Sequence, residues 1–446
     1  MAHSKTFNIL SKQIGEIKAI DAHTHINASC MSARGLHDIM LYHMVISELY
    51  SAGCPSGQRL SDEPEQNEKT SRIEEAIPYL EHVQNTSCYW LMRTILHELY
   101  GWDKPITLSN WRKLDACIRE KSTDPNWARQ ILARANITKA CTELALRGDG
   151  SNDDILFYSL EWAFFTRNQW GVFDAPLYEL EYAWQFDKPT RPLPVTMSNR
   201  VPVKRQITTV SEVKEALAHY CAAIPFERIV STAHHISTDI NYTLVSDDQM
   251  QKALDNRNNA GPFERDIYAS YLFENLLLEL EKEHSDIVFQ FSLGAEPLPF
   301  ETGSRLRQVT IRQLAEIIWR HPRINFHCYL SSRHANQSLC TLCRELPNLC
   351  LAGYWWHNFF PNTIAQVIEE RLDMLPMNKQ IGFFSDAYCV EWLYAKSNLV
   401  RMELANALAN RIERGQYTPD EAVKIAKKLL QETPKHQLSN CPKFCS

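Results

Sequence analysis

Short apolar runs alternate with amphipathic stretches along most of this chain, and this alternation constrains its fold more than any other feature. The apolar runs have the length and composition of strands, and they occupy residues 17–26, 137–142, 228–235, 286–294, 323–330, 348–356 and 380–386. Stretches with helical spacing stand between them. Two parallel strands need a crossover of about a dozen residues or more between them, which is usually a helix. The pattern therefore predicts a parallel sheet covered by helices.

Seven strands are visible in this pattern, and we expect the eighth between Phe157 and Thr209, where the spacing is poorer. Eight strand–helix units close into a (β/α)8 barrel, the TIM-barrel fold of the α/β class. An open doubly wound sheet is the alternative architecture. The barrel interpretation makes residues 1–446 a single elaborated domain, which is a length that barrels with insertions reach.

The excess length of the chain is concentrated before the second strand. Residues 36–125 contain two helical stretches, 36–50 and 73–100, with the polar segment 56–72 between them. We expect a helical insertion within the barrel, in which the polar segment is an exposed loop. At the other end of the chain, residues 431–446 are expected to form a flexible tail.

Composition and charge narrow the classes of function. The net charge is −6 and no run of five or more basic residues occurs, which argues against a nucleic-acid-binding surface. No apolar stretch approaches the roughly 18–20 residues of a membrane span, so we expect no membrane insertion. Residues 1–15 lack the apolar core of a signal peptide, and the 13 cysteines are an odd number. We expect a cytoplasmic protein with reduced thiols, and a homo-oligomer is left open.

The motif Asp21-Ala-His23-Thr-His25 at the end of the first expected strand is the strongest chemical signal. Residues two apart on a strand point to the same face, so His23 and His25 project together. They do so at the carboxyl end of the strand, which is the end where barrel active sites lie. Two imidazoles placed in this way can hold one divalent metal ion, and Zn²⁺ is the first choice. The alternative is a pair of partly buried, hydrogen-bonded histidines.

A second signal is Ser385-Asp386 at the end of the last expected strand. In a closed barrel this strand is the neighbour of the first, so Asp386 can complete the metal shell or act as a base beside the metal. Alone, an aspartate at such a position is as often a helix N-cap. Together with the His23 and His25 motif, Asp386 resembles the pattern of the amidohydrolase superfamily.

Several shorter motifs make the chain resemble the uronate isomerase branch of that superfamily, which also has a helical insertion after its first strand. Five segments carry this resemblance, in the family's order: Asn85–Gly101 with its Trp90, the pair Cys141-Thr142, the strand end Ala233-His234-His235-Ile236, the pair Trp355-Trp356, and Ser385-Asp386-Ala387-Tyr388. Each motif is short, and the specificity of the resemblance comes from their order and spacing.

This resemblance implies a metal-dependent aldose–ketose isomerisation of a hexuronate, in which a proton moves between C2 and C1 through an enediol. It implies that His23, His25 and Asp386 correspond to the metal ligands. His43 lies where the family has a substrate-facing His-Tyr pair, although the order here is Tyr42 then His43. The implied substrate is a small sugar acid or a related carboxylate.

Three positions depart from the family pattern. Ser292 stands where the family has a metal-reaching histidine, Tyr388 stands where it has an arginine, and Glu143-Leu144 stands where it has two aspartates. A neutral hydroxyl is a poor zinc ligand, and a tyrosine lacks the permanent charge that pairs with a carboxylate. His234, His235 and His327 are the candidates for the missing ligand, because each lies at a strand where other amidohydrolases place a metal-ligand histidine, and His234 is our first choice.

We therefore take Asp386, His43 and Tyr388 as catalytic candidates. The substrate-binding candidates are Trp355, Trp356, Arg305, His357 and Ser292. The two tryptophans alternate faces if they lie on a strand, so we expect at most one to line the pocket. Arg305 is placed to meet an anionic substrate or merely to begin a solvated helix, and His357 faces substrate or caps a strand end.

Three functions remain open from the sequence. The first is the sugar-acid isomerase, and the second is a metal-dependent hydrolase or lyase, because metal-bound water is the usual reagent of such barrels. The third is a relative that binds a small ligand without catalysis. Ser292 and Tyr388 favour the second and third readings, whereas the retained His23, His25 and Asp386 favour an enzyme.

Overall fold

The computed structural model describes residues 4–57, 60, 65–162, 172–186, 202–237, 240–294, 308–356 and 359–438. These residues divide into two compact units. Unit 1 comprises Met1–Leu156, Phe360–Ile368 and Phe383–Gln431, and unit 2 comprises Phe157–Phe359, Glu369–Gly382 and Glu432–Ser446. Each unit is described by itself, and the single-domain interpretation stays a prediction.

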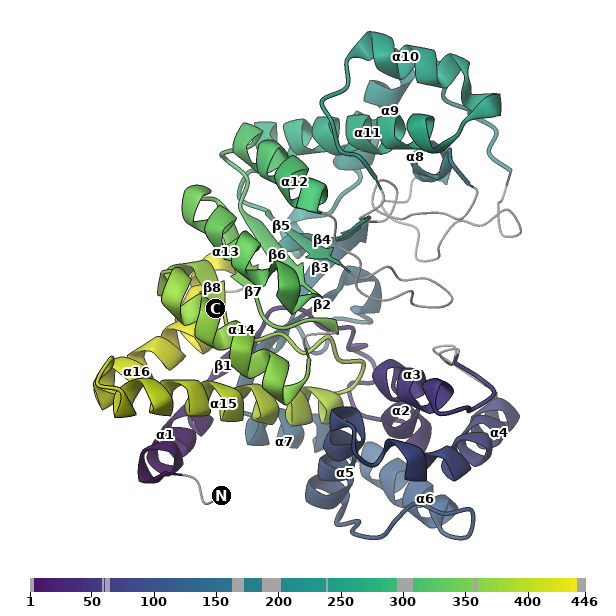
Figure 1. Cartoon of the computed structure of the whole chain (residues 1–446). Coiled ribbons are helices and arrows are strands. Elements are labelled where there is room, and N and C mark those ends of the chain that lie inside the picture. Colours follow the sequence, from purple (N-terminus) through teal and green to yellow (C-terminus); the bar gives the residue numbers. More distant parts are fainter. Residues whose placement is uncertain are drawn as a thin grey trace. The chain divides into compact units, whose positions relative to one another are not determined.

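Eight strands alternate with helices along the chain, as the barrel interpretation requires (Figure 1). They are β1 (Ala19–Asp21), β2 (Ile137–Glu143), β3 (Leu156–Trp162), β4 (Ser231–Ile236), β5 (Val288–Leu293), β6 (Phe326–Leu330), β7 (Leu349–Ala352) and β8 (Gln380–Ile381). In unit 1, β1 pairs in parallel with β2; in unit 2, each strand from β3 to β8 pairs in parallel with the next. The strand that the sequence pattern did not resolve is β3, near the start of the expected interval.

The helices of unit 1 gather around one long helix, α15. They are α1 (Lys5–Gly15), α2 (Leu36–Met40), α3 (His43–Ser51), α4 (Gln66–Ala76), α5 (Ser87–Tyr100), α6 (Trp111–Ser122), α7 (Trp127–Arg134), α15 (Val390–Glu413) and α16 (Pro419–Lys427). Short 3₁₀ segments are η1 (Ile77–Val83) and η2 (Leu144–Leu146), and η9 (Lys428–Glu432) is a π-helix. Helix α15 packs against α1, α5, α7 and α16 and is buried around most of its circumference. It is therefore the central support of this unit.

The helices of unit 2 are α8 (Ala175–Phe186), α9 (Val210–Ala222), α10 (Asp247–Asp255), α11 (Pro262–Glu283), α12 (Gln308–Arg320), α13 (Asn336–Glu345) and α17 (Thr433–Leu438). Its 3₁₀ turns are η4 (Phe226–Arg228), η5 (Arg257–Asn259), η6 (Arg333–Ala335) and η8 (Met377–Lys379), and α14 (Pro361–Met374) begins in unit 1 and ends in unit 2. Helices α8 to α11 pack together in one group, drawn in teal in Figure 1.

The helical insertion before β2 is present, but its helices differ from the predicted ones. The expected helix 36–50 is two helices, α2 and α3, because the backbone of Tyr42 is extended between them. The expected helix 73–100 is interrupted by the 3₁₀ segment η1, in which Pro78 lies in the first turn, and it restarts at α5, where the Thr86 side chain caps the Tyr89 N–H. Helix α4 begins at Gln66, so part of the polar segment predicted as a loop is helical.

Several strands are shorter than the sequence predicts. Strand β1 ends at Asp21 and β7 ends at Ala352. After each of these residues the chain no longer makes the regular hydrogen bonds of a parallel sheet. After β7, Gly353 and Trp356 both have positive φ angles, 46° and 49°. The prediction that Trp355 and Trp356 alternate faces on a strand is therefore wrong, and their rings contact each other edge to face at 5.4 Å.

The predicted flexible tail is in part a packed helix. In α17, Thr433 and Leu438 are buried, and the Thr433 hydroxyl donates to the Met377 carbonyl at 3.0 Å. Residues 439–446 lie outside the described part of the chain.

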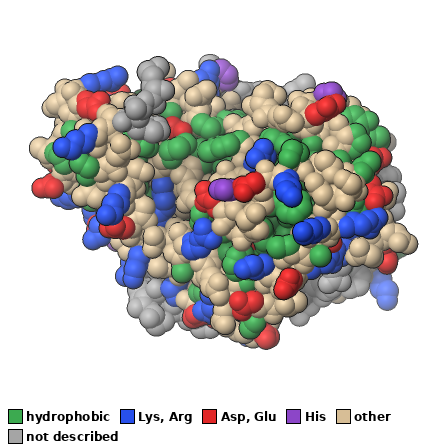
Figure 2. Space-filling view, turned by 90° about the horizontal axis from the view of Figure 1, so that it is seen from below, with side chains coloured by type: hydrophobic (Ala, Val, Ile, Leu, Met, Phe, Trp, Pro, Cys, Tyr) green, Lys and Arg blue, Asp and Glu red, His purple; other side chains and the backbone are tan. Residues whose placement is uncertain are grey.

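Charged side chains of both signs are interspersed over the face shown in Figure 2, with apolar patches between them. The net charge of −6 is thus not gathered into one acidic region on that face. Among the described helices, none combines the length and the apolar character that crossing a membrane requires.

Candidate metal centre

The segment that follows β1 forms the backbone frame of the candidate site in unit 1. On one side, the Thr24 N–H donates to the Cys141 carbonyl of β2 at 2.6 Å. On the other side, Ala22 and His25 donate to the carbonyls of Phe383 and Ala387 at 3.4 and 2.8 Å. The chain that follows β8 thus lies directly beside the chain that follows β1, which is the neighbourhood that a closed barrel predicts.

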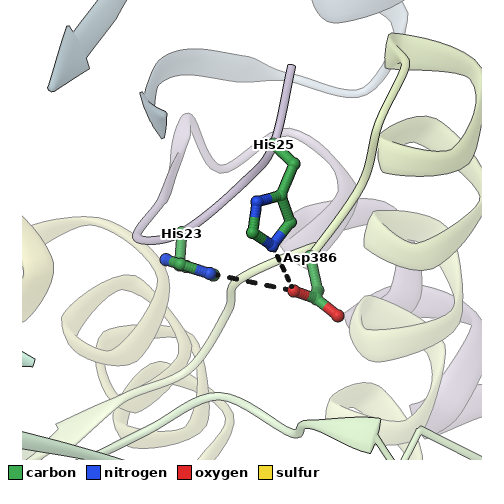
Figure 3. A group of neighbouring side chains, drawn as sticks. All are labelled: His23, His25 and Asp386. Carbon is green, nitrogen blue, oxygen red and sulfur yellow. Dashed lines mark hydrogen bonds and ion pairs between the residues drawn. The ribbon is translucent and has the colours of Figure 1, made fainter. Parts of the chain in front are cut away.

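Three side chains meet in this frame, and they are three of the four predicted metal ligands, without His234 (Figure 3). The Nε2 atoms of His25 and His23 lie 3.1 and 3.8 Å from Oδ1 of Asp386. One ligand atom from each residue lies within 4.8 Å of the others. The side chains are 12, 15 and 7% exposed for His23, His25 and Asp386. The sequence therefore identified a group of nitrogen and oxygen donors that converge on one point.

Asp386 adopts an unusual backbone conformation to take part in this group. Its φ angle is +52°, in the left-handed region that residues other than glycine rarely occupy, although aspartate tolerates it better than most. Its own N–H donates to the His23 carbonyl at 3.0 Å. Asp386 is not a helix N-cap, because α15 begins at Val390 and Cys389 occupies that position. Such outliers collect at functional sites, where the surrounding structure holds them.

Glu143, at the end of β2, is a partner of His25 that the sequence interpretation did not assign. Its Oε1 is hydrogen-bonded to His25 Nδ1, so each ring nitrogen of this imidazole faces a carboxylate. A carboxylate on the far nitrogen of a ligating histidine fixes the ring orientation and tautomer. The signal that could have found it is its position directly after Cys141-Thr142.

The charges of His23 and Asp386 suit a cation, whereas His25 must release a proton before it ligates one. Burial and, to a smaller extent, the positive charge of His25 together lower the pKa of His23 to about 4, although Asp386 and Glu143 act in the opposite direction. Burial also opposes a charge on His25, but Tyr388, Asp386 and Glu143 outweigh it and hold the pKa of His25 well above 6.5. Burial would raise the pKa of Asp386, but the hydrogen bond from His25 and the nearby positive charges hold it well below its usual range. At neutral pH His23 is thus neutral and Asp386 ionised, as metal ligation requires.

Aromatic side chains line the same region of unit 1. The Tyr388 ring stacks on His25 with 4.9 Å between centroids, and the His43 ring meets the edge of Tyr388 at 5.5 Å. Tyr42 is buried against Trp392, whereas His43 and Tyr388 are half-buried. The structure therefore brings all three catalytic candidates, Asp386, His43 and Tyr388, into one neighbourhood. Their roles stay predictions.

The remaining candidates belong to unit 2. His234 is buried, its Nε2 lies 3.0 Å from the Thr232 hydroxyl, and its ring stacks on Phe289 at 4.0 Å. Burial holds the pKa of His234 well below its ordinary value. Among the described residues the convergent group does not include His234, so its role as a ligand stays a prediction.

Ser292 is paired with His235 of the neighbouring strand, as the register of β4 and β5 dictates. Its hydroxyl lies 2.5 Å from His235 Nδ1 and donates to the His234 carbonyl at 3.1 Å. The His235 ring lies 5.5 Å from that of Trp355, which is buried, while Trp356 is half-buried. Arg305 and His357 lie outside the described residues.

The residues of the convergent group fit a divalent cation on their own chemistry. Two imidazole nitrogens and one carboxylate oxygen are the donor set of many catalytic zinc sites, which keep a further position for water or substrate. The same donors also accept other first-row metals, so the set indicates a divalent metal rather than one element.

No family model and no curated protein sequence matches the chain. Solved structures do resemble it along its whole length. A uronate isomerase from Thermotoga maritima is 12% identical and aligns over 98% of each chain with a TM-score of 0.73. A glucuronate isomerase from Caulobacter crescentus is 14% identical over 97% of this chain and 94% of its own, with a TM-score of 0.77. A uronate isomerase from Bacillus halodurans is 15% identical over 98% of each chain, with a TM-score of 0.66. These similarities confirm the predicted fold class.

Proposed function

We propose that this chain is a metal-dependent aldose–ketose isomerase of the uronate isomerase type, acting on a hexuronate or a closely related sugar acid. The observation that carries the proposal is the convergence of His23, His25 and Asp386, which lie in the adjacent segments after β1 and β8. The proteins named uronate and glucuronate isomerase that share this fold along their whole length support the reaction and the substrate class.

A single divalent metal ion, with Zn²⁺ as the first choice, would be held by His23, His25 and Asp386. When bound, such an ion acts as a Lewis acid that polarises substrate oxygens and orients the reacting carbons. Glu143 would hold His25 in place through its Nδ1 atom. His234 remains the proposed further ligand.

The isomerisation moves one proton from C2 to C1 and a second from the C2 hydroxyl to the C1 oxygen. The carbonyl thereby shifts from C1 to C2, and substrate and product have the same composition. His43 and Tyr388 are the proposed proton carriers, because both are half-buried and their rings are in contact beside His25. The pKa of Asp386 lies well below its usual range, which makes this carboxylate a better ligand than base. We therefore place Asp386 first in metal binding and second in proton transfer.

The rest of the substrate-binding set is proposed from the sequence. Trp355, Trp356 and Ser292, together with Arg305 and His357, are proposed to contact the sugar acid.

Incubation of the metal-loaded protein with glucuronate or galacturonate tests the proposal. The expected result is a ketouronate, detected by proton NMR as the anomeric signals of the aldose decline, together with solvent deuterium exchange at C2. The same reaction with Asp386→Asn is the control and should give no product. Absence of both product and exchange at high concentration of metal-loaded protein would contradict the isomerase and favour the metal-dependent hydrolase or lyase.

A further inference from the structure

Helix α15 carries a buried lysine, Lys396, close to the group of His23, His25 and Asp386. It has no part in the proposed metal binding or proton transfer. Lys396 is 1% exposed, although an ammonium group is costly to bury unless it is well paired. Its Nζ donates to the Ser385 carbonyl and to the Tyr42 hydroxyl, each at 2.7 Å. Nζ also lies 4.9 Å from the centre of the Tyr42 ring. The lysine is therefore fixed by specific acceptors rather than by solvent.

Tyr42 connects Lys396 to the main chain of Asp386. Because the Tyr42 oxygen accepts a hydrogen bond from Lys396, its own O–H is available to donate, and it donates to the Asp386 carbonyl at 2.7 Å. Lys396 and Tyr42 thus bind the carbonyl oxygens of two consecutive residues, Ser385 and Asp386. Both carbonyls are buried, where an unpaired oxygen would be unfavourable.

The segment that Lys396 and Tyr42 bind contains Asp386, the residue with the left-handed backbone conformation. The N–H groups of Ser385 and Asp386 are bound by Asp21 Oδ1 at 2.9 Å and by the His23 carbonyl at 3.0 Å. The Ala387 N–H donates to the Ser385 hydroxyl at 3.2 Å, and the Ala387 carbonyl accepts from His25 at 2.8 Å. Strand β1 and its continuation therefore bind one side of the segment, and Lys396 with Tyr42 binds the carbonyls of the other side.

We propose that Lys396 and Tyr42 are positioning residues that hold the Ser385–Asp386 backbone in the left-handed conformation in which the Asp386 carboxylate meets His23 and His25. This inference rests on the proposed metal site. Both act through the main chain, Tyr42 at the Asp386 carbonyl and Lys396 at the Ser385 carbonyl. Without them the strained φ of +52° is free to relax, and the carboxylate leaves the ligand group.

Arg401, one and a half turns further along α15, provides a matched control. It is also a buried cation that donates to main-chain carbonyls, those of Ile14 at 2.6 Å and Ile17 at 2.9 Å, and those of residues 135 and 136 at 3.2 and 3.3 Å. These carbonyls precede β1 and β2 rather than follow them. Arg401→Met therefore removes a buried charge from the same helix without removing a hydrogen bond to the Asp386 segment.

The test measures Co²⁺ binding by the full-length protein, because the visible absorption of Co²⁺ reports the number and geometry of its ligands. Lys396→Met, Tyr42→Phe, the double variant and Arg401→Met are compared with the wild type. Tyr42→Phe keeps the ring and its stacking on Trp392, so it remains informative if Lys396→Met does not fold. Circular dichroism and urea unfolding confirm that each variant is native at the temperature of the titration.

We expect the dissociation constant for Co²⁺ to rise about tenfold in each single variant, the lower end of the loss caused by removing groups beyond the ligands. The absorption band should change in shape, and the double variant should lose little more than either single one, because both residues hold one segment. Arg401→Met should lose stability while keeping the wild-type affinity and spectrum.

The proposal is wrong if Lys396→Met and Tyr42→Phe, both folded, bind Co²⁺ with unchanged affinity and spectrum. It is also wrong if Arg401→Met weakens Co²⁺ binding by the same factor, because the effect would then be a general loosening of α15. A wild-type protein that binds Co²⁺ but isomerises no hexuronate contradicts the proposed reaction alone, and the variant comparison still decides the positioning role. A wild type that binds no Co²⁺ overturns both.

Discussion

The Nε2 atom of His25 lies 3.1 Å from Oδ1 of Asp386, although the two residues are 361 positions apart in the chain. β1 and β8 are the first and last strands, and the contact joins the segment that follows β1 to the segment that follows β8. It also brings an imidazole and a carboxylate together in a largely buried place, where a cation is the natural third partner. The predictions below follow from this contact and its immediate neighbours.

Glu143 orients His25, so its replacement should weaken metal binding without removing a ligand. We expect Glu143→Gln to raise the dissociation constant for Zn²⁺ by about 10- to 100-fold, because a carboxylate behind a ligating histidine makes it a better donor. Competition with a chromophoric chelator measures this constant. Glu74→Gln is the matched control, since Glu74 forms an exposed ion pair with Arg112 and should leave the constant unchanged. Equal constants for Glu143→Gln and the wild type would argue against the orienting role.

The neutral state of His23 should appear in the pH dependence of stability. Burial and the charge of His25 lower the pKa of His23 to about 4, whereas a histidine in an unfolded chain has a pKa near 6.5. Between these values the unfolded state binds a proton that the native state does not, so the free energy of unfolding rises with pH through this window. The contribution is on the order of 3 kcal/mol from the size of the shift.

This dependence is measured by urea unfolding of the metal-free protein from pH 4 to 7, beside His23→Gln. Titration of all other groups is largely shared by the two proteins, so the difference between their curves isolates His23. The variant should lose less stability than the wild type as the pH falls. Parallel curves would show that His23 is protonated in the native protein as readily as in the unfolded chain.

Tyr388 should matter for turnover more than for metal binding. Tyr388→Phe keeps the ring stacked on His25 but removes the hydroxyl, so the affinity for metal should be retained. If the hydroxyl transfers a proton to or from the sugar, kcat should fall by about 100-fold or more. Tyr50→Phe, at an exposed position on α3, is the comparison. A kcat within twofold of the wild type would remove Tyr388 from the catalytic set.

The packing of α1 on α15 predicts that two isoleucines of α1 contribute very differently to the free energy of unfolding. Ile14 is 0% exposed and Ile9 is 52% exposed, both on α1. Ile14→Ala should lower the free energy of unfolding by about 2–5 kcal/mol, because it leaves a cavity in the core of unit 1. Ile9→Ala should change it by less than about 0.5 kcal/mol. Chemical unfolding of both variants checks the pair, and similar losses would contradict this view of the core.

The sequence was informative where the chemistry is local to a strand end. His23 and His25 could be predicted as a pair at the end of an apolar run, although β1 ends at Asp21 and both lie in the segment after it. Asp386 could be predicted because the last strand of a barrel neighbours the first. The end of β7 could not be predicted, because Gly353 and Trp356 adopt positive φ angles. The spacing of apolar residues in the sequence gives no indication of such angles.

The sequence did not predict the residues that support the site, for a different reason. Lys396 lies on a helix, where a lysine is usually solvated, and only the packing of α15 under the segment after β8 makes it a buried donor. Tyr42 similarly interrupts an expected helix, with its backbone extended and its hydroxyl bound to the Asp386 carbonyl. Glu143 carried a signal in its place after Cys141-Thr142, but its pairing with His25 depends on the neighbouring strand.

The most direct test of the account is the metal content of the purified protein, measured by inductively coupled plasma mass spectrometry for the wild type, His23→Ala and Asp386→Asn. The account predicts about one divalent ion per wild-type chain and a large loss in both variants, with circular dichroism showing that both remain folded. A wild-type protein that holds no stoichiometric metal after reconstitution, or variants that keep the full content, would contradict the claim that His23, His25 and Asp386 form a metal centre.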